Sequence, residues 1–142
     1  MSQYIVDASI VVQLLVSETH TAETKALFAS IEDRNKLIVP EFGLLECTNV
    51  LWKHVRFHGL QQTDAEQQIQ ILVALNVVVA PVIGLMPRTL EIGLKHQLAI
   101  YDSVYITLAE QLGYPLITDD SRQAIAASAE GITLKAITDF RP

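Results

Sequence analysis

The sequence predicts an α/β fold: a three-layer α/β/α sandwich around a parallel sheet of about five strands. Short apolar segments alternate with longer segments of helical periodicity, which is typical of parallel strands covered by helices on both faces. The length of 142 residues suits one domain, residues 1–142. Half of the residues are apolar and 18% are charged, which is enough apolar material for a packed core.

The predicted strands are short apolar runs that end at polar residues or proline. The first, YIV, ends at Asp7, and the fourth, PLIT, ends at two neighbouring aspartates, Asp119 and Asp120. Two adjacent carboxylates repel each other, and neither a strand nor a turn requires both, so a functional role for Asp119 or Asp120 is considered. The five predicted strands are 4–6, 36–40, 76–82, 115–118 and 132–137.

The predicted helices carry ordinary start and stop signals. Asp7 or Ser9 caps the first helix, and Pro40 occupies the first turn of the longest one, where its missing N–H does no harm. Gly113 ends another helix at the usual C-terminal position. The predicted helices are 9–16, 20–32, 40–58, 63–75, 87–98, 101–113 and 121–131.

Composition excludes several classes of protein. No apolar run reaches the ~18 residues of a membrane span, and the N-terminus lacks a basic segment followed by an apolar one, so no secretion signal is expected. Cys47 is the only cysteine, which excludes an internal disulfide and favours a reduced, cytoplasmic location. The net charge of −6 means that a nucleic-acid partner must be held locally or through bound cations.

Acidic residues follow two of the predicted strands. In open parallel sheets the ligand binds at the carboxyl ends of the strands, where the strand order reverses. Asp7 follows the first strand, and Asp119 and Asp120 follow the fourth. Asp102 stands in the first turn of its helix, where the helix dipole favours an anion. Taken singly, Asp7 and Asp102 are better explained as structural residues at helix starts.

Glu46 is harder to explain structurally. Its helix, 40–58, is largely apolar all round, which predicts burial on more than one side. A carboxylate there lacks an ordinary solvated face and should be paired, neutralised or bound to a cation. Asn49 shares the side of Glu46 and could donate a hydrogen bond to it.

Together these acids suggest a metal site. Clustered carboxylates repel one another unless a cation neutralises them, and oxygen-only ligands suit Mg²⁺ or Mn²⁺. Such ions support phosphoryl transfer and phosphodiester hydrolysis. No glycine-rich phosphate-binding loop follows any predicted strand, so a nucleotide cofactor has no support in the sequence.

Three segments in order, IVDAS, PEFGLLECTNVLW and YDSVYITLAEQLGYPLITDD, resemble a PIN domain. More narrowly, they resemble the VapC-type toxin ribonucleases of prokaryotic toxin–antitoxin pairs, and the resemblance runs nearly end to end. It implies a doubly wound α/β/α fold and an endoribonuclease that uses Mg²⁺ or Mn²⁺ to cut single-stranded RNA. It also implies a small antitoxin protein as partner, with an extended or helical segment over the active-site groove.

The resemblance implies roles for particular residues. Ser9, Asn49 and Thr118 match supporting positions. The chain departs from the family at Asp119, where a small or neutral residue is usual, so Asp119 is expected to cap the next helix, pair with Arg122, or act through a metal-bound water. Strand alternation predicts that Thr118 and Asp120 point one way and Asp119 the other. The matching catalytic and metal-binding acids are Asp7, Glu46, Asp102 and Asp120.

The basic residues give a weaker signal. The segment KHVRFH contains Lys53 and Arg56 and could guide RNA toward the site, or it could be the solvated end of a helix. Arg122 directly follows the acids and could contact a phosphate. These three residues are predicted RNA contacts.

The aromatic residues and the remaining histidines have structural readings of similar weight. Tyr101 and Tyr105 flank Asp102 and could stack on bases, although core packing is expected for at least one of them. Trp52 is expected in the core or an interface. His20 and His96 are read as isolated residues with a structural role or simple exposure.

Assembly and alternative functions complete the expectations. The mean hydropathy of +0.30 is high for a chain of this size, so a two-fold homodimer is expected to bury the excess. One alternative is a phosphatase or phosphoacceptor-type α/β domain. Phosphatases of the haloacid dehalogenase type, however, need Asp-x-Asp after the first strand, and this chain has Asp7-Ala8-Ser9. The other alternative is a catalytically silent PIN-like binding module.

Overall fold

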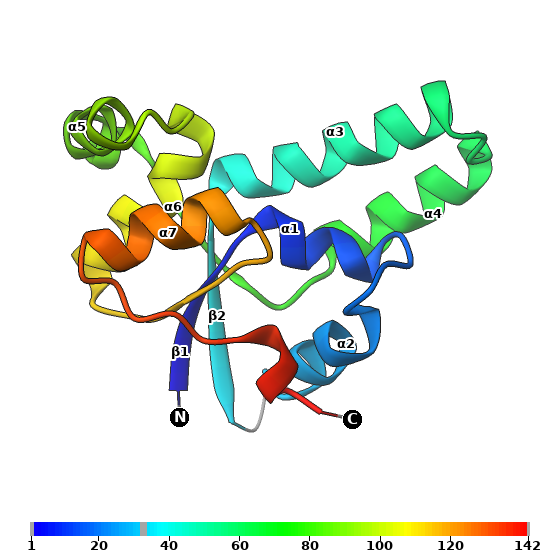
Figure 1. Ribbon diagram of the computed structural model, residues 1–142. Helices are drawn as coiled ribbons and strands as arrows, with labels where there is room; N and C mark the ends of the chain where they lie inside the picture. Colours follow the sequence, from blue (N-terminus) through cyan, green and yellow to red (C-terminus); the bar gives the residue numbers. More distant parts are fainter. Residues whose placement is uncertain (1, 32–33, 142) are drawn as a thin grey trace.

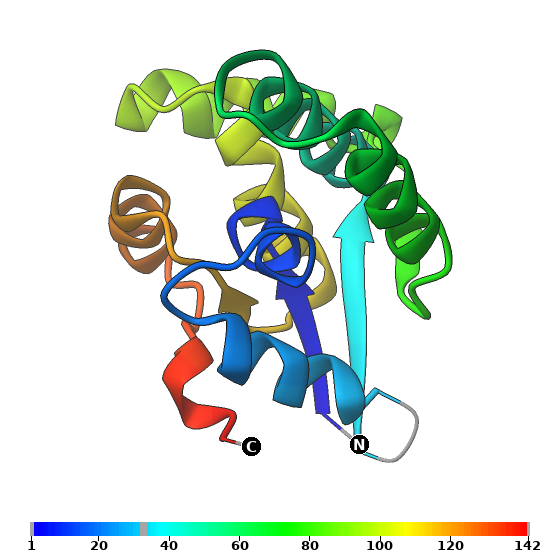
Figure 2. The same cartoon turned by 90° about the vertical axis from the view of Figure 1, so that its right-hand side faces the viewer.

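The computed structural model describes residues 2–31 and 34–141, and it confirms the predicted α/β class. In this part of the chain one parallel sheet has the order β3-β2-β1-β4, and helices lie on both sides of it (Figures 1 and 2). Its strands are β1 (Ser2–Val6), β2 (Asn35–Pro40), β3 (Val78–Ala80) and β4 (Leu116–Ile117).

The predicted fifth strand, 132–137, is wrong. Only Leu134 pairs with the sheet, in an isolated parallel bridge to Leu116. The strand that it would extend, β4, is two residues long because the chain turns away after Ile117, so no longer edge is available for pairing.

The helices follow the predicted order with small shifts at their ends. The predicted helix 9–16 is a short α-helix continued by a 3₁₀ turn, and the predicted end of 20–32 lies outside the described residues. The α-helices are α1 (Ala8–Val11), α2 (Thr21–Ala29), α3 (Glu41–Phe57), α4 (Gln62–Val73), α5 (Met86–His96), α6 (Ile100–Leu112) and α7 (Ser121–Ala129). The 3₁₀ turns are η1 (Val12–Leu14), η2 (Ile83–Leu85) and η3 (Ile137–Asp139).

The core forms where α6 packs against β1, β2 and β4. The inner strands are apolar along their buried lengths because both faces of a parallel sheet are covered. Tyr105 of α6 is fully buried among these strands, so core packing is confirmed for one of the two tyrosines beside Asp102. Fully buried members of the core include Ile5, Val6, Leu37, Tyr105, Ile106, Leu116 and Ile117.

The helices α3 and α4 form a hairpin that extends away from the sheet (Figure 1). Gly59, in the connection between them, has a φ of 77°, a conformation that suits glycine. The expectation that α3 is buried on more than one side is wrong for the chain alone, because Leu45, Trp52 and Phe57 are exposed. No helix in the described part of the chain is long and apolar enough to cross a membrane.

Candidate active site

The site lies where the strand order reverses, between β1 and β4. Val6 pairs with Ile117, and the backbone N–H of Asp7 donates to the carbonyl of Ile117 at 3.0 Å. This register places Asp7 beside Thr118, at the carboxyl ends of two neighbouring strands. Both chain segments turn into helices here, so their side chains face the same crevice.

Asp7 is the most buried of the predicted acids, with 5% exposure. It caps α1: one of its oxygens accepts hydrogen bonds from the Ser9 N–H at 3.1 Å and the Thr118 hydroxyl at 3.2 Å. The other oxygen accepts a longer bond, 3.4 Å, from the Gln123 amide. Burial raises the pKa of the Asp7 carboxyl above its ordinary value, against the opposing effect of these hydrogen bonds.

Glu46 reaches the crevice from the N-terminal half of α3 and accepts a 2.7 Å hydrogen bond from the Tyr105 hydroxyl. Burial raises the pKa of Glu46 to about 7, with smaller contributions from repulsion by Asp7 and Asp102. The donor is thus Tyr105 rather than the expected Asn49. Gly43 permits this contact, since a Cβ at that position would lie 2.6 Å from the Tyr105 hydroxyl oxygen.

Asp102 lies in the first turn of α6. Partial burial raises the pKa of its carboxyl, and repulsion from Asp120 and Asp7 adds to the effect, while Arg122 opposes it. The backbone carbonyl of Asp102 accepts a 2.9 Å bond from the Gln123 amide, the same group that contacts Asp7. The first turn of α6 is therefore tied to the end of β1 through α7.

The two adjacent aspartates have different partners. Asp120 caps α7, accepting hydrogen bonds from the N–H groups of Arg122 at 2.9 Å and Gln123 at 3.1 Å. The expectation that Asp119 caps this helix or pairs with Arg122 is wrong, because the capping position falls one residue later. The Arg122 guanidinium instead donates to the backbone carbonyl of Gln97 at 3.3 Å.

Asp119 points away from Asp7, toward the start of α2. One of its oxygens accepts from the Gln13 amide at 2.6 Å and lies 3.0 Å from Nδ1 of His20. Its backbone N–H donates to the Ser9 hydroxyl at 3.0 Å. The interpretation of His20 as an isolated residue is therefore wrong, and so is that of His96, which lies 2.6 Å from a carboxylate oxygen of Glu130.

Gln123 and Gln13 are site residues that the sequence analysis missed. Gln123 is fully buried, and its amide nitrogen joins Asp7 to the backbone of Asp102. Gln13 is 2% exposed and holds Asp119. Helical spacing offers a faint signal for Gln123, which follows Asp120 by three residues. No local pattern separates either glutamine from an ordinary surface residue.

The chemistry of the four acids suits a divalent cation. Among the described residues, no lysine, arginine or histidine forms an ion pair with Asp7, Glu46, Asp102 or Asp120. Within residues 2–31 and 34–141, no three or more Asp, Glu, His or Cys side chains are arranged closely enough to hold a metal ion. Asp7 is buried and the other three acids are partly buried, with Arg122 the one cationic group that lowers the pKa of Asp102. Their carboxylate oxygens are the donors that Mg²⁺ or Mn²⁺ would accept, so the donor chemistry fits such an ion.

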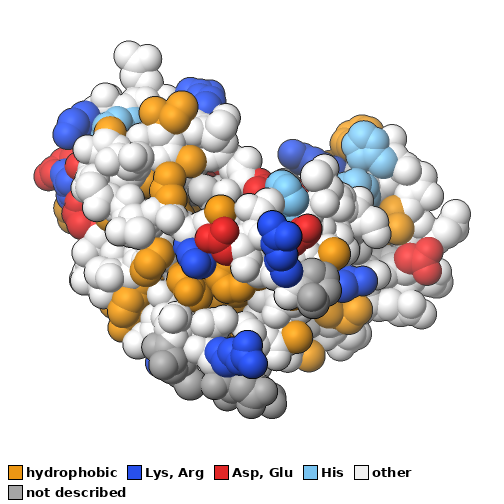
Figure 3. Space-filling model, turned by 60° about the horizontal axis from the view of Figure 1, so that its bottom comes forward, with side chains coloured by type: hydrophobic (Ala, Val, Ile, Leu, Met, Phe, Trp, Pro, Cys, Tyr) orange, Lys and Arg blue, Asp and Glu red, His pale blue; other side chains and the backbone are white. Residues whose placement is uncertain are grey.

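Of the predicted RNA contacts, Arg122 lies close enough to Asp102 to lower its pKa, and aromatic residues line a hollow beside Glu46. Lys53 and Arg56 are exposed on the outer half of α3. Tyr101 is 60% exposed and stacks on Phe42, with ring centroids 4.6 Å apart. A surface hollow of about 570 Å³ opens here, and Figure 3 shows the molecular outline hollowed between two lobes. The hollow is lined by Phe42, Leu45, Glu46, Thr48, Asn49, Trp52 and Tyr101.

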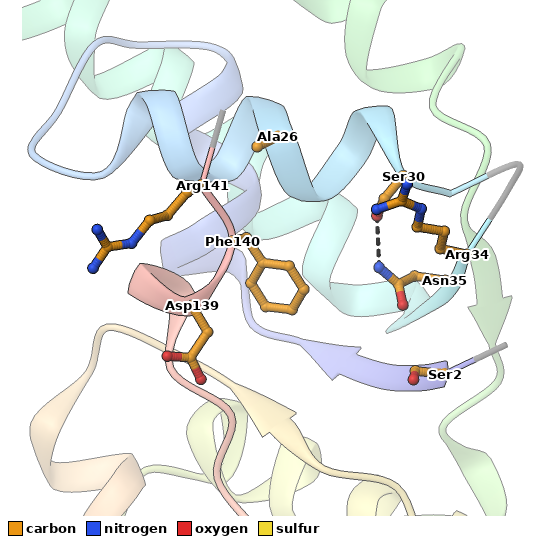
Figure 4. A pocket seen from close by; sticks show the side chains of 8 residues that line it. All are labelled: Ser2, Ala26, Ser30, Arg34, Asn35, Asp139, Phe140 and Arg141. Carbon is orange, nitrogen blue, oxygen red and sulfur yellow. Dashed lines mark hydrogen bonds between the residues drawn. The ribbon is translucent and has the colours of Figure 1, made fainter.

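A second hollow, of about 550 Å³, lies at the opposite edge of the sheet, between α2 and the C-terminal segment (Figure 4). It contains Arg34 and Arg141, but Figure 4 shows their guanidinium groups at opposite ends of the lining, with Arg141 directed away from Phe140. Its polar groups do not converge on one point. Size alone therefore does not identify this hollow as a binding site.

Comparison with known proteins identifies the family. The model of the PIN domain family matches residues 4–129. Ribonuclease VapC3 of Pyrobaculum aerophilum is 28% identical over 124 residues, which cover 84% of this chain and 91% of that protein. Two solved structures share the fold: Mycobacterium tuberculosis VapC20, a sarcin-ricin loop cleaving toxin, and Rickettsia felis VapBC2 bound to a promoter DNA fragment.

The likeness to these two structures extends over nearly the whole chain. VapC20 superimposes with a TM-score of 0.69 and 19% identity, covering 98% of this chain and 99% of its own. The VapBC2 chain superimposes with a TM-score of 0.71 and 11% identity, covering 94% of this chain and 98% of its own. The match to the family model covers most of the sequence, so this chain belongs to the PIN domain family and is related to the VapC toxin ribonucleases.

Proposed function

We propose that this protein is a metal-dependent endoribonuclease that cleaves RNA at accessible, single-stranded positions, including those exposed within structured RNA. The observation that carries the proposal is the group of carboxylates at the reversal of the strand order, which form no ion pair among the described residues and repel one another. A site of this kind favours a divalent cation, and the family relation favours RNA as substrate.

In this proposal Asp7, Asp102, Asp120 and Glu46 hold Mg²⁺ or Mn²⁺. The ion supplies Lewis acidity and offsets the negative charge that develops on the phosphodiester. Thr118, Ser9 and Gln123 keep the Asp7 carboxylate in one orientation through their hydrogen bonds. Burial raises the pKa of Glu46 to about 7, so a cation bound beside it would favour its ionised form near neutral pH.

Parallel assays test this function against its alternatives. Purified protein is incubated with single-stranded RNA, single-stranded DNA and a phosphomonoester, each with Mn²⁺ or with EDTA, and Asp7→Asn is the matched control. Cleavage of RNA that requires Mn²⁺ and is lost in the variant supports the proposal. Release of phosphate from the monoester alone would indicate a phosphatase, and RNA binding without cleavage would indicate a silent binding module.

We also propose that the protein is the toxin of a toxin–antitoxin pair. The support is the relation to VapC ribonucleases and the likeness to VapBC2, a complex whose name pairs a VapC with a VapB. The protein encoded directly upstream would be co-expressed with this chain and purified. If the pair is genuine, the two should co-purify, and the partner should suppress Mn²⁺-dependent RNA cleavage.

A homodimer is the expected assembly. Large apolar side chains are exposed on α3, on α5 and at the start of α6, and orange hydrophobic surface is visible in Figure 3. Leu94 is 72% exposed and belongs to this set of apolar side chains, and a concentration of exposed apolar surface marks a site that a partner covers. Light scattering at micromolar concentration should give twice the monomer mass, and Leu94→Glu should restore the monomer. A monomeric wild type would contradict the dimer.

A further inference from the structure

The side chain of His20 is anchored at the edge of the proposed site. Its Nδ1 lies 3.0 Å from the Asp119 carboxylate, and its backbone N–H donates to the Gln13 side-chain oxygen at 2.8 Å. Gln13 also donates to Asp119 at 2.6 Å, so the three residues close a ring of hydrogen bonds. The histidine and aspartate side chains are each 29% exposed, which places this held pair at the surface.

A short hydrogen-bond chain connects this cluster to the proposed metal ligands. The Asp119 N–H donates to the Ser9 hydroxyl, which lies 3.4 Å from the Thr118 hydroxyl, and Thr118 donates to Asp7. Asp119 itself stands between Thr118 and Asp120 in the chain. The His20 ring is therefore linked to the carboxylates through Asp119, at the edge of the site where α2 begins.

The hydrogen bond between the His20 ring and Asp119 decides which ring nitrogen is available to bind a ligand. A carboxylate only accepts hydrogen bonds, so the nitrogen that faces Asp119 must carry a hydrogen. Among the described residues, none forms a hydrogen bond or ion pair with Nε2, which leaves it available to a ligand. A histidine whose one nitrogen is held by a carboxylate presents the other in a fixed direction.

We propose that His20 binds a phosphate of the RNA backbone next to the cleavage position, and that Asp119 and Gln13 hold its ring for this contact. The inference rests on the proposed nuclease function and adds a substrate contact to it. The acids of the site repel the RNA backbone, so donors are needed at its edge. His20 and Asp119 together carry little net charge, so the contact is a directed hydrogen bond rather than long-range attraction.

The contact depends on protonation of Nε2. Asp119 raises the pKa of His20, mainly through their hydrogen bond, and Asp119 and Glu23 are the charged groups that act on the ring. The protonated ring donates from both nitrogens. The neutral ring keeps its hydrogen on the nitrogen facing Asp119 and cannot donate to a phosphate. The contribution of His20 to RNA affinity should therefore disappear as pH rises through the raised pKa.

Two substitutions separate substrate contact from a structural role. His20→Asn keeps a donor at the position of Nδ1 but removes the group at Nε2, whereas His20→Gln keeps a donor near Nε2 and gives up the bond to Asp119. Substrate contact predicts about tenfold weaker RNA binding for His20→Asn, the size expected for one hydrogen bond to a charged group, with an unchanged melting temperature. His20→Gln should retain more of the affinity. If His20 has only a structural role, neither variant should change RNA affinity. His20→Gln should then be less stable than His20→Asn, because it gives up the bond to Asp119.

RNA affinity is measured by fluorescence anisotropy with a labelled oligonucleotide in EDTA, and KM and kcat are measured separately with Mn²⁺. His96→Asn is the matched control, because His96, at the end of α5, also pairs with a carboxylate, but that carboxylate belongs to Glu130 at the C-terminal end of α7. It should lower stability and leave RNA affinity unchanged. The salt dependence of binding should stay the same in His20→Asn and become shallower in Arg122→Gln, which removes a full positive charge.

The outcomes separate this inference from the proposed function. Equal RNA affinity for wild type and His20→Asn at pH 6 overturns the inference alone. Wild-type protein that binds RNA without cleaving it overturns the nuclease function but leaves the affinity test of His20 valid. Wild-type protein that binds no RNA overturns both.

Discussion

The two ends of α7 carry acidic residues in opposite electrostatic surroundings. At its C-terminal end, Glu130 is 6% exposed and contacts Arg88, Lys95 and His96 at 2.8, 2.9 and 2.6 Å. At its N-terminal end, Asp120 adjoins the other acids of the site, which form no ion pair among the described residues, although Arg122 partly offsets the raised pKa of Asp102. Glu130 has its ion-pair partners within the fold, which indicates a structural role. The predicted metal-binding acids at the N-terminal end of α7 form no ion pair in the described part of the chain, which indicates a place where a cation could bind.

The pKa values express the same difference. Hydrogen bonds from Lys95 and His96 lower the pKa of Glu130 to about 2, so its ionised form is stabilised within the fold. Burial raises the pKa of Asp7 and brings that of Glu46 to about 7, so burial works against their ionised forms, and a bound cation would offset this cost. Four predictions test this contrast.

The largest effect is expected at the acids themselves. Asp7→Asn and Asp102→Asn should each lower Mn²⁺-dependent RNA cleavage by more than about a hundredfold, since even the outer partners of metal ligands are worth 10–100-fold. Both variants should unfold cooperatively, and in metal-free buffer slightly later than wild type, because one repelling charge is gone. Cleavage rates and thermal melts measure this. Full activity in highly purified samples of both variants would refute the metal site.

The next prediction separates the two adjacent aspartates. Asp120→Asn should cost at least as much activity as Asp102→Asn, while Asp119→Asn should cost less than tenfold, because Asp119 faces His20 and Gln13. Asparagine is also a good helix cap, so Asp120→Asn should leave α7 intact. Cleavage rates across a Mn²⁺ titration distinguish the two, and a greater loss for Asp119→Asn would contradict the arrangement.

At the opposite end of α7 the expected effect is on stability. Glu130→Gln should lower the free energy of unfolding by about 1.5–3 kcal/mol, the usual worth of hydrogen bonds to charged groups, and should leave RNA cleavage unchanged. Denaturant unfolding measures the first and the standard assay the second. Loss of activity in a stably folded variant would mean that this acid takes part in function.

The smallest effect is a dependence of stability on pH. Glu46 binds a proton up to about pH 7 in the folded protein but only up to its ordinary value of 4.5 when unfolded. Between these values the folded state holds more protons, so metal-free protein should lose stability as pH rises from about 5 to about 8. Saturating Mn²⁺ should abolish this slope, and Glu46→Gln should reduce it. Melting temperatures that rise with pH in EDTA would contradict the raised pKa.

Much of the architecture follows from local sequence. The parallel α/β class, the order of the helices and the placement of Asp7 at a strand end are readable because apolar periodicity and capping residues act over a few neighbours. The expected fifth strand, 132–137, failed for a non-local reason. An apolar segment becomes a strand only where a neighbouring edge is long enough to pair with it, and β4 is too short.

The sequence by itself determined that acids cluster at the carboxyl edge of a parallel sheet, and that Glu46 needs a partner. Only the tertiary structure decided which partners the acids have. Glu46 bonds to Tyr105, 59 residues away, and Asp119 meets His20, 99 residues away. Asp119 and Asp120 diverge as expected, but they lie beyond the end of β4 at Ile117, so the start of α7 and the distant side chains around them set their directions. Those long-range contacts depend on the whole fold, so local pattern cannot specify them.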